Sequence, residues 1–497
     1  MNIAAPLPKP LDVIIVGAGI SGIGMAAHLK EKCPQRSFVM LDRRARLGGT
    51  WDLFRYPGVR SDSDMYTLGF AFAPWRDDQS IADGDTILSY LDRVVDERGI
   101  RQHIRFGQQV ITANWDSRAA LWTIGLANGE QVTGRFLFLG SGYYDYDNPH
   151  DAQIAGLERF GGTVVHPQFW PEGLDTTGKR IVVIGSGATA VTLVPALAEN
   201  AAHVTMLQRT PTWYLNRPKH DRLANLLRRI LPEKWAYALV RERNTRLQDF
   251  LFTRSRTKPQ EVGAFLTGQL KKELGEAYNE SDFTPPYGPW EQRLCLVPDG
   301  DMFQSLREGK ASVVTGQIAT VDEGGILLEG GQRIHADVIV TATGLKLAVA
   351  GKITVSLDGA PVNFAKHFYY RNCMFSNVPN LVALFGYLNA GWTLRVDIVA
   401  DWLCRLFNHM DADGLDVATP VLDQDHNLID ERPFEAFSSG YLQRSKALIP
   451  RSATTAPWRI SMNYRTDRRE MHEAPLEDGV MRFDRVGALT TLPSLSG

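Results

Sequence analysis

The chain has 497 residues, too many for one ordinary hydrophobic core, so we expect two or three domains. Its 54 basic and 56 acidic residues give a formal net charge of −2, which provides no positive field for nucleic acid and argues against such a partner. The four cysteines contain no C-x-x-C pair, which disfavours a disulfide framework or a metal site; we expect reduced thiols, no bound metal and a cytoplasmic location. Neither a secretory signal pattern nor a run of about 18 apolar residues is found, so we expect no secretion and no membrane span.

The first predicted unit is a strand at residues 12–16, a glycine-rich loop and a helix. In the loop G-x-G-x-x-G, Gly17 permits the tight turn, Gly19 lets a pyrophosphate approach the backbone, and Gly22 lets the helix pack close to the strand. The next strand, 38–41, ends at Asp42, whose carboxylate would accept ribose hydroxyls. The unit therefore predicts a dinucleotide site, with contacts from Gly17, Gly19, Ser21, Gly22, Asp42 and Arg43.

The segment G-G-T-W at 48–51 stands where a flavin-dependent disulfide reductase would carry its redox cysteine. Without a cysteine there, electrons must leave a flavin by another route, and oxygen is the natural acceptor. Gly49 would allow the backbone to lie against the cofactor, with Thr50 and Trp51 lining it, although Trp51 could equally belong to the core.

The loop at 55–70 carries several acids and bases just ahead of a helical pattern. We take Asp62 as its functional carboxylate, with Asp64 as the alternative, and a simple solvated loop is also possible. Tyr66 is a further candidate for cofactor contact.

A strand and glycine turn at 135–142 lead to the segment F-x-G-x-x-x-H-x-x-x-W-P at 160–171. Four fixed residues over eleven positions, with a proline directly after them, rarely coincide by chance, whereas His166 alone could be a linker histidine packed beside Trp170. We therefore regard Phe160, Gly162, His166 and Trp170 as a fingerprint on a linker.

A second strand and loop follow, with the strand at 180–184 and the loop at 185–190. Its next strand ends in Leu207-Gln208-Arg209 where the first unit has Leu41-Asp42-Arg43, so an amide replaces the carboxylate. The carboxylate of Asp42 in the first unit would repel a 2′-phosphate, whereas the strand end at Gln208-Arg209 in the second unit would hold one. The first loop therefore suits FAD and the second NADPH, unless Arg209 is merely solvated. The second set of contacts comprises Gly185, Gly187, Ala188, Thr189, Ala190, Arg209 and Thr210.

Residues 219–285 read as a helical insertion with a basic outer face. The favoured interpretation is that this basic face is simply exposed to solvent. A weak membrane-surface association is also conceivable, because Trp235, Tyr237, Leu239 and residues 250–252 interleave with the basic residues.

The segment 288–295 contains Arg293, our candidate for a permanent catalytic cation. A guanidinium keeps its charge and could stabilise an anionic peroxide and the charge that develops on an attacked carbonyl. The alternative is a surface ion pair with Glu291.

After the A-T-G strand and turn at 334–344, the chain is expected to return to the first domain. Thr343 and Gly344 in this turn are predicted cofactor contacts. A returning strand and helix at 380–407 then bring Leu388, Asn389 and Ala390 to the flavin ring, while the helix start stabilises the reduced anion. The tail after Gly414 reads as irregular.

These elements predict an α/β protein with two Rossmann-like dinucleotide-binding domains, the second inserted in the first. We expect the FAD domain at 1–147 and, with the tail, at 375–497. The NADPH domain occupies 153–374 and includes the helical insertion.

Together, G-G-T-W at 48–51, D-S-D-M-Y-T-L-G-F from Asp62, the fingerprint at 160–171 and P-W-E-Q-R-L-C at 289–295 resemble the type I Baeyer–Villiger monooxygenases. The likeness is greatest to their ethionamide-activating subgroup and covers about residues 11–411. It implies that NADPH reduces FAD and that O2 then forms a C4a-peroxyflavin, which inserts oxygen beside a ketone carbonyl to give an ester or lactone. Sulfur compounds are oxidised as well.

The resemblance also implies residue roles. Asp62 would lie beside the flavin and orient Arg293, although the family usually has Lys-Arg where this chain has Gln292-Arg293. His166 and the linker would couple nicotinamide binding to domain movement. Two alternatives remain: an N-oxygenating flavin monooxygenase, in which an amide tends to replace Asp62, and a flavin- and nicotinamide-binding sensor that oxygenates nothing.

Overall fold

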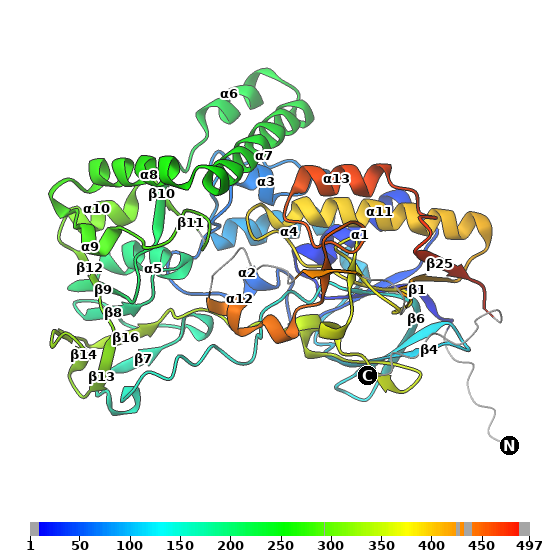
Figure 1. The fold of residues 1–497 in the computed structure, drawn as a ribbon, viewed down its shortest axis with the longest axis horizontal. Coiled ribbons are helices and arrows are strands. Elements are labelled where there is room, and N and C mark those ends of the chain that lie inside the picture. Colours follow the sequence, from blue (N-terminus) through cyan, green and yellow to red (C-terminus); the bar gives the residue numbers. More distant parts are fainter. Residues whose placement is uncertain (1–8, 293, 424–427, 432–439, 487–497) are drawn as a thin grey trace.

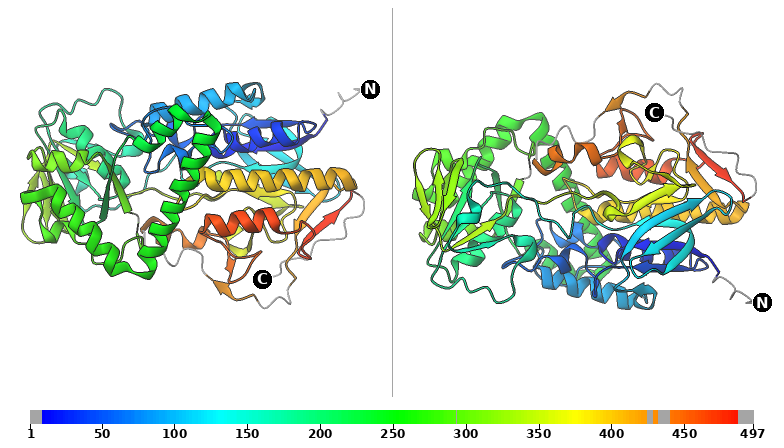
Figure 2. Two further views of the ribbon diagram at one scale, coloured as in Figure 1. Left: turned by 90° about the horizontal axis from the view of Figure 1, so that it is seen from above. Right: turned by 90° about the horizontal axis from the view of Figure 1, so that it is seen from below.

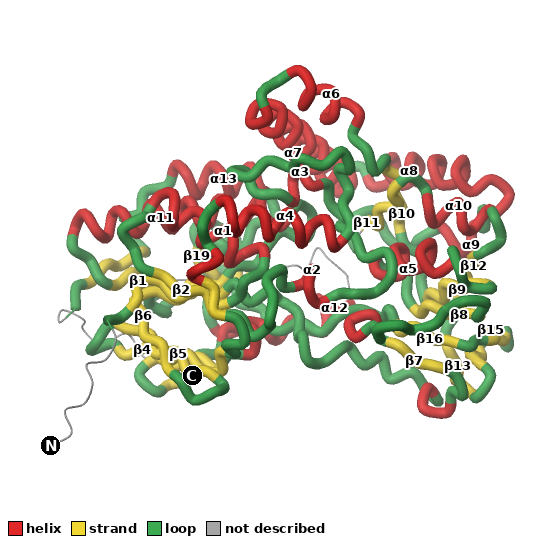
Figure 3. The backbone as a smooth tube through the Cα atoms, turned by 180° about the vertical axis from the view of Figure 1, so that it is seen from behind, coloured by secondary structure: helices red, strands yellow, loops and turns green. Residues whose placement is uncertain are grey.

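The computed structural model describes residues 9–292, 294–423, 428–431 and 440–486. The described residues form two lobes that lie side by side, with a helical hairpin projecting from the upper surface in the view of Figure 1. Figure 3 shows strands in both lobes with helices packed over them. The mixed α/β architecture with two parallel-sheet cores confirms the predicted fold class.

The first lobe is built around β1 (Leu11–Val16), which pairs in parallel with β2 (Phe38–Leu41) and β6 (Gln131–Leu139). Residues 13–16 are all buried, as the continuous apolar run requires when helices and other strands cover both faces of a parallel sheet. Among the described residues the sheet has nine strands; the others are β3 (Ile104–Arg105), β4 (Val110–Asp116), β5 (Leu121–Leu126), β17 (Thr354–Leu357), β18 (Ala360–Pro361) and β21 (Leu381–Ala383).

Helix α1 (Ile20–Lys32) packs along the long α11 (Trp392–Asp413), although nearly four hundred residues separate their starts. Gly24 permits this approach, because a Cβ there would collide with Val396 and lie 2.9 Å from the ring of Phe70. The other helices of this lobe are α2 (Thr50–Leu53), α3 (Met65–Leu68), α4 (Gly84–Glu97), α12 (Gly440–Arg444) and α13 (Tyr464–Glu473). Its short strand pairs are β19 (Tyr369–Tyr370) with β20 (Met374–Phe375), β22 (Val417–Pro420) with β25 (Met481–Asp484), and β23 (Asp430–Glu431) with β24 (Ser452–Ala453).

The second lobe repeats the design with a parallel sheet of β12 (Ala311–Thr315), β9 (His203–Gln208), β8 (Arg180–Ile184), β16 (Val338–Thr341) and β7 (Thr163–Val165). Helices α5 (Ala188–Ala198) and α10 (Asp301–Arg307) cover one side of it. A small antiparallel sheet of β13 (Ile318–Asp322), β14 (Gly325–Leu328) and β15 (Arg333–His335) is attached.

The chain returns to the first lobe earlier than the predicted boundary at 374. Strand β17 pairs in parallel with β4, so residues from Thr354 onward already belong to the first sheet. The sequence does not reveal this because β17 is a short strand beside the two-residue edge strand β18. Only its two central residues are buried, and it lacks the apolar run that marks the central strands.

The helical insertion comprises α6 (Arg222–Ile230), α7 (Glu233–Thr257), α8 (Pro259–Leu274) and α9 (Glu280–Phe283), and it lies between the paired strands β10 (Trp213–Arg217) and β11 (Leu294–Pro298). Seen from above, α7 crosses from the second lobe to the first (Figure 2). Its buried Arg241 donates to the carbonyls of Tyr66 at 2.8 Å and Gly69 at 2.6 Å and pairs with Asp397 at 2.9 Å. The insertion is therefore anchored to the first lobe as well as to its own.

Candidate functional site

A cavity of about 330 Å³ lies where the two lobes meet. Its walls include the first glycine loop, the end of β2, the segment that crosses to the second lobe after β6, and the N-terminal residues Ala188 and Thr189 of α5. Both predicted dinucleotide loops thus contribute to or adjoin one space.

The first loop has the geometry that its three glycines predict. At Gly17, φ is +101°, and a Cβ there would lie 2.6 Å from the carbonyl oxygen of Gly140. A Cβ at Gly22 would collide with the carbonyl of Gly17, so helix α1 can start this close to the strand only with glycine. Gly19 and Ser21 line the cavity.

Asp42 lies at the end of β2 and lines the cavity. Its carboxylate oxygens accept hydrogen bonds from the backbone N–H groups of Ala18 at 2.6 Å and Arg44 at 2.8 Å. Burial raises the pKa of this carboxyl, and the two backbone hydrogen bonds oppose the rise. Neighbouring Arg43 also lines the cavity and pairs with Asp147 at 3.0 Å.

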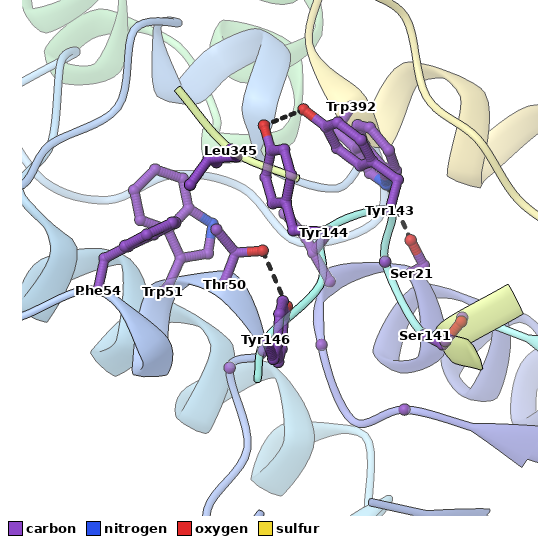
Figure 4. Close-up of a pocket in the computed structure, with 18 of the residues that line it drawn as sticks. Ser21, Thr50, Trp51, Phe54, Ser141, Tyr143, Tyr144, Tyr146, Leu345 and Trp392 are labelled. Atoms are coloured by element: carbon purple, nitrogen blue, oxygen red, sulfur yellow. Dashed lines mark hydrogen bonds between the residues drawn. The ribbon is translucent and has the colours of Figure 1, made fainter. Parts of the chain in front are cut away.

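The G-G-T-W segment forms the next wall. A Cβ at Gly49 would lie 3.2 Å from the Cα of Gly19, so the two glycines let these backbone segments touch. Thr50 shares a hydrogen bond of 3.0 Å with the hydroxyl of Tyr146, and Trp51 lines the cavity beside it (Figure 4). Trp51 is only partly buried against the core, which favours a cavity role over plain packing.

Asp62 and Asp64, the two alternative carboxylates, lie in different surroundings. Asp62 lines the cavity. Asp64 does not; it caps α3 by accepting from the backbone N–H of Tyr66 at 3.1 Å and Thr67 at 3.2 Å, and it accepts from the Asn244 amide at 2.8 Å. Asp64 is 1% exposed and is therefore a structural cap, which leaves Asp62 as the carboxylate that faces the cavity.

Two sequence predictions about the first lobe differ from the structure. Of residues 388–390, only Ala390 lines the cavity: Leu388 is buried in an apolar cluster, and the Asn389 amide donates to the carbonyl of Met462 at 3.0 Å. Tyr66 is buried against the insertion helix, with its ring 5.7 Å from that of Tyr237, and does not line the cavity. Leu388, Asn389 and Tyr66 each pack against or bond to partners from distant parts of the chain.

Aromatic residues that the sequence reading missed form a further wall of the cavity. Trp392 donates its indole N–H to Ser21 Oγ at 2.8 Å and stacks on Tyr143, with ring centroids 5.0 Å apart (Figure 4). Tyr143 and Tyr144 share a hydrogen bond between their hydroxyls. The aromatic pair directly after the G-S-G turn at 140–142 is the signal that could have identified the Tyr143–Tyr144 wall.

The second loop repeats the glycine geometry. At Gly185, φ is +132°, and a Cβ would collide with the carbonyl of Ala342 in the A-T-G strand. A Cβ at Gly187 would meet nothing within 4 Å, so the N-terminus of α5 is open to an incoming group, whereas Ala190 is buried. Ser186 donates to the carbonyl of Thr210 at 3.3 Å and ties the loop to the end of β9.

Two arginines lie beside this second loop. Arg209 is exposed, and the predicted contact with a phosphate needs an accessible side chain. Arg444 lies in the tail, which the sequence predicted to be irregular. It approaches Gly344 closely: a Cβ at Gly344 would lie 3.7 Å from Nη2 of Arg444. Burial, followed by the charge of Arg209, lowers the pKa of Arg444. Thr343 and Gly344 thus lie in a cationic environment.

The fingerprint occupies the link between the lobes. His166 Nδ1 accepts from the backbone N–H of Gln168 at 3.2 Å, and the Gln168 amide donates to the carbonyl of Asp145 in the first crossing at 2.8 Å. Burial lowers the pKa of His166, which favours the neutral form of its ring. Gly162 permits the close approach of Phe160, while Trp170 packs against the core of the second lobe.

Arg293 lies outside the described residues. The strand that follows it, β11, pairs with β10 from Leu294 onward, and Leu296 in that strand lines the cavity. All four cysteines lie in the described ranges, are buried and form no disulfide.

Comparisons with known proteins show the family of this chain. Residues 14–235 match the family model described as pyridine nucleotide-disulphide oxidoreductase. The chain is 46% identical over 482 residues to the FAD-containing monooxygenase EthA of Mycobacterium tuberculosis H37Rv, covering 96% of this chain and 98% of that protein. It is 44% identical over 484 residues to the probable FAD-binding monooxygenase AlmA of Acinetobacter baylyi, covering 96% and 97%.

Solved structures with the same fold include an oxidised steroid monooxygenase bound to NADP, with a TM-score of 0.75 and 22% identity, covering 96% of this chain and 100% of that one. An open cyclohexanone monooxygenase gives a TM-score of 0.76 at 20% identity, with the same coverage. The protein belongs to the FAD-containing monooxygenases, as its identity to the EthA and AlmA sequences shows. No helix within the described ranges is long and apolar enough to cross a membrane.

Proposed function

We propose that this enzyme uses NADPH, FAD and O2 to insert one oxygen atom into ketones, giving esters or lactones, and to oxidise sulfur compounds. The observation that carries the proposal is the single cavity that joins the first glycine loop, the N-terminus of α5 and the carboxylate of Asp62. FAD, when bound and reduced by NADPH, supplies the oxygen activation. The protein supplies binding, orientation and charge.

The first lobe fits FAD. Gly17 and Gly19 leave room for a pyrophosphate against the backbone, and the Asp42 carboxylate reaches the cavity, where it would accept ribose hydroxyls. Thr50 and Trp51 on one side and the Tyr143–Trp392 stack on the other bound the region beyond the pyrophosphate. They would exclude water from the reacting end of the site.

The second lobe fits NADPH. The open N-terminus of α5 would hold the pyrophosphate, and Arg209 with Thr210 would hold the 2′-phosphate. Arg444 adds a second cation beside the A-T-G turn and would strengthen the preference for the phosphorylated dinucleotide. His166 and Gln168 link this lobe to the crossing segment, which supports a hinge role for the fingerprint.

We assign Arg293 as the catalytic cation and Asp62 as the carboxylate that orients it. A guanidinium remains charged at every working pH, so it can stabilise negative charge that develops on oxygen during the transfer. Tyr56, which also lines the cavity, stays protonated because burial raises its pKa to about 12. It can therefore donate a hydrogen bond but does not act as a base at neutral pH.

The test is a turnover screen of the FAD-loaded enzyme with NADPH and O2 against linear ketones, cyclic ketones, thioethers and amines, with products identified by mass spectrometry. We expect esters or lactones from ketones and sulfoxides from thioethers. N-oxides alone would identify an N-oxygenating enzyme. NADPH oxidation without any oxygenated organic product from any class would exclude the proposal and favour a sensor.

The proposed 2′-phosphate contact gives a separate prediction. Arg209→Ala should weaken NADPH binding about 10- to 100-fold, the value of one lost charge-assisted contact, while NADH binding changes little. Dissociation constants from calorimetry on the FAD-loaded enzyme measure this without turnover. Arg333→Ala, which removes an exposed arginine elsewhere on the same lobe, is the control. Equal losses for both dinucleotides would place the phosphate elsewhere.

A further inference from the structure

The projecting hairpin of α6 and α7 exposes large apolar side chains. We define the hairpin patch as the side chains of Leu223, Leu226, Ile230, Trp235 and Leu239, which are 47%, 53%, 65%, 69% and 52% exposed. The hairpin projects above the two lobes in Figure 1, and the exposed fractions show that the other described residues leave much of each of these side chains uncovered. A cluster of this size on one projecting element exceeds the scattered apolar residues of an ordinary surface.

Helix α6 carries apolar residues both on its inner side, which packs on the first lobe, and on its exposed outer side. Ala224 is buried and Leu227 packs against the core of the first lobe, which accounts for its inner side. Leu223, Leu226 and Ile230 follow at i, i+3 and i+7 and share the outer side, which the fold itself does not use. The sequence reading placed Tyr237 in the same surface, but Tyr237 is buried against the first lobe.

Exposed cations border the hairpin patch. Arg222 and Arg229 lie on one flank of the outer side of α6, and Lys234 precedes Trp235 at the turn into α7. Within the described part of the chain, none of these three pairs with a carboxylate. Other basic residues of the hairpin do have partners: Arg228 pairs with Asp78 at 3.3 Å and Arg243 with Asp221. Glu233, the residue before Lys234, pairs with Arg76 at 2.7 Å.

We propose that the hairpin patch docks the enzyme onto an anionic lipid surface. Outward leucine, isoleucine and tryptophan side chains flanked by cations with no carboxylate partner are the combination that holds a helix in the plane of a membrane interface, with the apolar side chains among the acyl chains and the cations at anionic headgroups. Tryptophan favours this interface because its ring is apolar and its N–H is polar. The sequence alone favoured a solvated face; the exposure of these apolar side chains in the structure favours an interface instead.

The test is flotation of the full-length, FAD-loaded enzyme with vesicles of phosphatidylcholine alone and of phosphatidylcholine with 30% phosphatidylglycerol. We expect binding to the anionic vesicles that weakens as salt rises. Ile230→Glu combined with Trp235→Glu should lower the partition coefficient at least about tenfold, because two inserted side chains become charged. Arg229→Glu with Lys234→Glu should lower it while leaving the apolar surface intact.

Phe265→Glu is the matched control, because Phe265 is 61% exposed but lies on α8, away from the hairpin. It should bind vesicles as the unchanged enzyme does, and all variants should keep their FAD absorbance and their vesicle-free turnover. Absence of binding to anionic vesicles, or equal losses in Phe265→Glu and the hairpin variants, would overturn the proposal. So would concentration-dependent dimerisation, seen by sedimentation velocity, that the hairpin variants abolish, since the patch would then bind a second copy.

Discussion

Replacing Asp62 by alanine is expected to lower the rate of product formation about 100-fold or more, while FAD stays bound and is still reduced by NADPH. The carboxylate lines the cavity, whereas the FAD pyrophosphate and ribose are expected at the distant glycine loop and Asp42. If Asp62 orients Arg293, its loss misplaces the cation, and a misplaced stabilising charge typically costs two to three orders of magnitude in rate. NADPH would then be consumed with formation of hydrogen peroxide instead of product.

Stopped-flow absorbance measures flavin reduction, and product analysis against NADPH consumed measures coupling. Ser63→Ala is the control, because Ser63 is the next residue and also lines the cavity. Arg293→Ala should behave as Asp62→Ala does, and the double variant should be no slower than the slower single variant if the two act as one unit. Normal coupling in Asp62→Ala would remove this residue from the mechanism.

The contrast with Asp64 sharpens this prediction. Asp64→Ala should destabilise the fold by about 1–3 kcal/mol, because it removes a helix cap and leaves buried donors without a partner. Those donors include the Asn244 amide at 2.8 Å. If Asp64→Ala instead kept its stability and lost oxygenation, the two carboxylates would have to exchange roles.

The largest loss of stability is expected for Arg395→Met. Arg395 on α11 pairs with Asp467 on α13 at 2.9 Å, and both side chains are 1% exposed. The guanidinium also lies 4.0 Å from the ring of Tyr387, whose hydroxyl donates to the same carboxylate at 2.7 Å. Methionine would leave a buried carboxylate with one hydrogen bond, and removal of one partner of such a pair costs about 3–5 kcal/mol.

Urea unfolding at pH 7, followed by circular dichroism on the FAD-free chain and its variants, measures this loss. Arg395→Met with Asp467→Leu should recover much of it, because the apolar pair removes both charges together. Arg465→Met is the control: its ion pair with Glu242 is exposed, so its loss should change the unfolding free energy by less than about 1 kcal/mol. An Arg395→Met protein as stable as the control would contradict the argument.

Much of the site could be read from the sequence because its signals are local. The turn at Gly17, the close helix start at Gly22 and the carboxylate of Asp42 each depend on a few consecutive residues, and the structure has each of them where the motif predicts. The same holds for Gly185. Backbone conformation at a glycine loop is set by neighbours in the chain, so no knowledge of distant contacts is needed.

Other features depended on partners that no local pattern identifies. Trp392 reaches the cavity because α11 packs against α1, and Leu388 is withdrawn from it by an apolar cluster. Arg444 approaches the A-T-G turn at Gly344 from the tail, where the sequence shows only irregular spacing. Strand β17 joins the first sheet between β4 and the short edge strand β18, and its four residues are too few to show the pattern of a central strand.

The sequence by itself predicted the two dinucleotide loops and the cofactor expected at each, and it identified the family. The tertiary structure decided that Asp62 and not Asp64 faces the cavity, which aromatic residues form its walls, and that the insertion presents an apolar surface outward. The physical reason is that the backbone conformation of a glycine loop is set by adjacent residues in the chain. Cavity walls and exposed surfaces, by contrast, are made by segments hundreds of residues apart, and only their packing decides which side chains are covered.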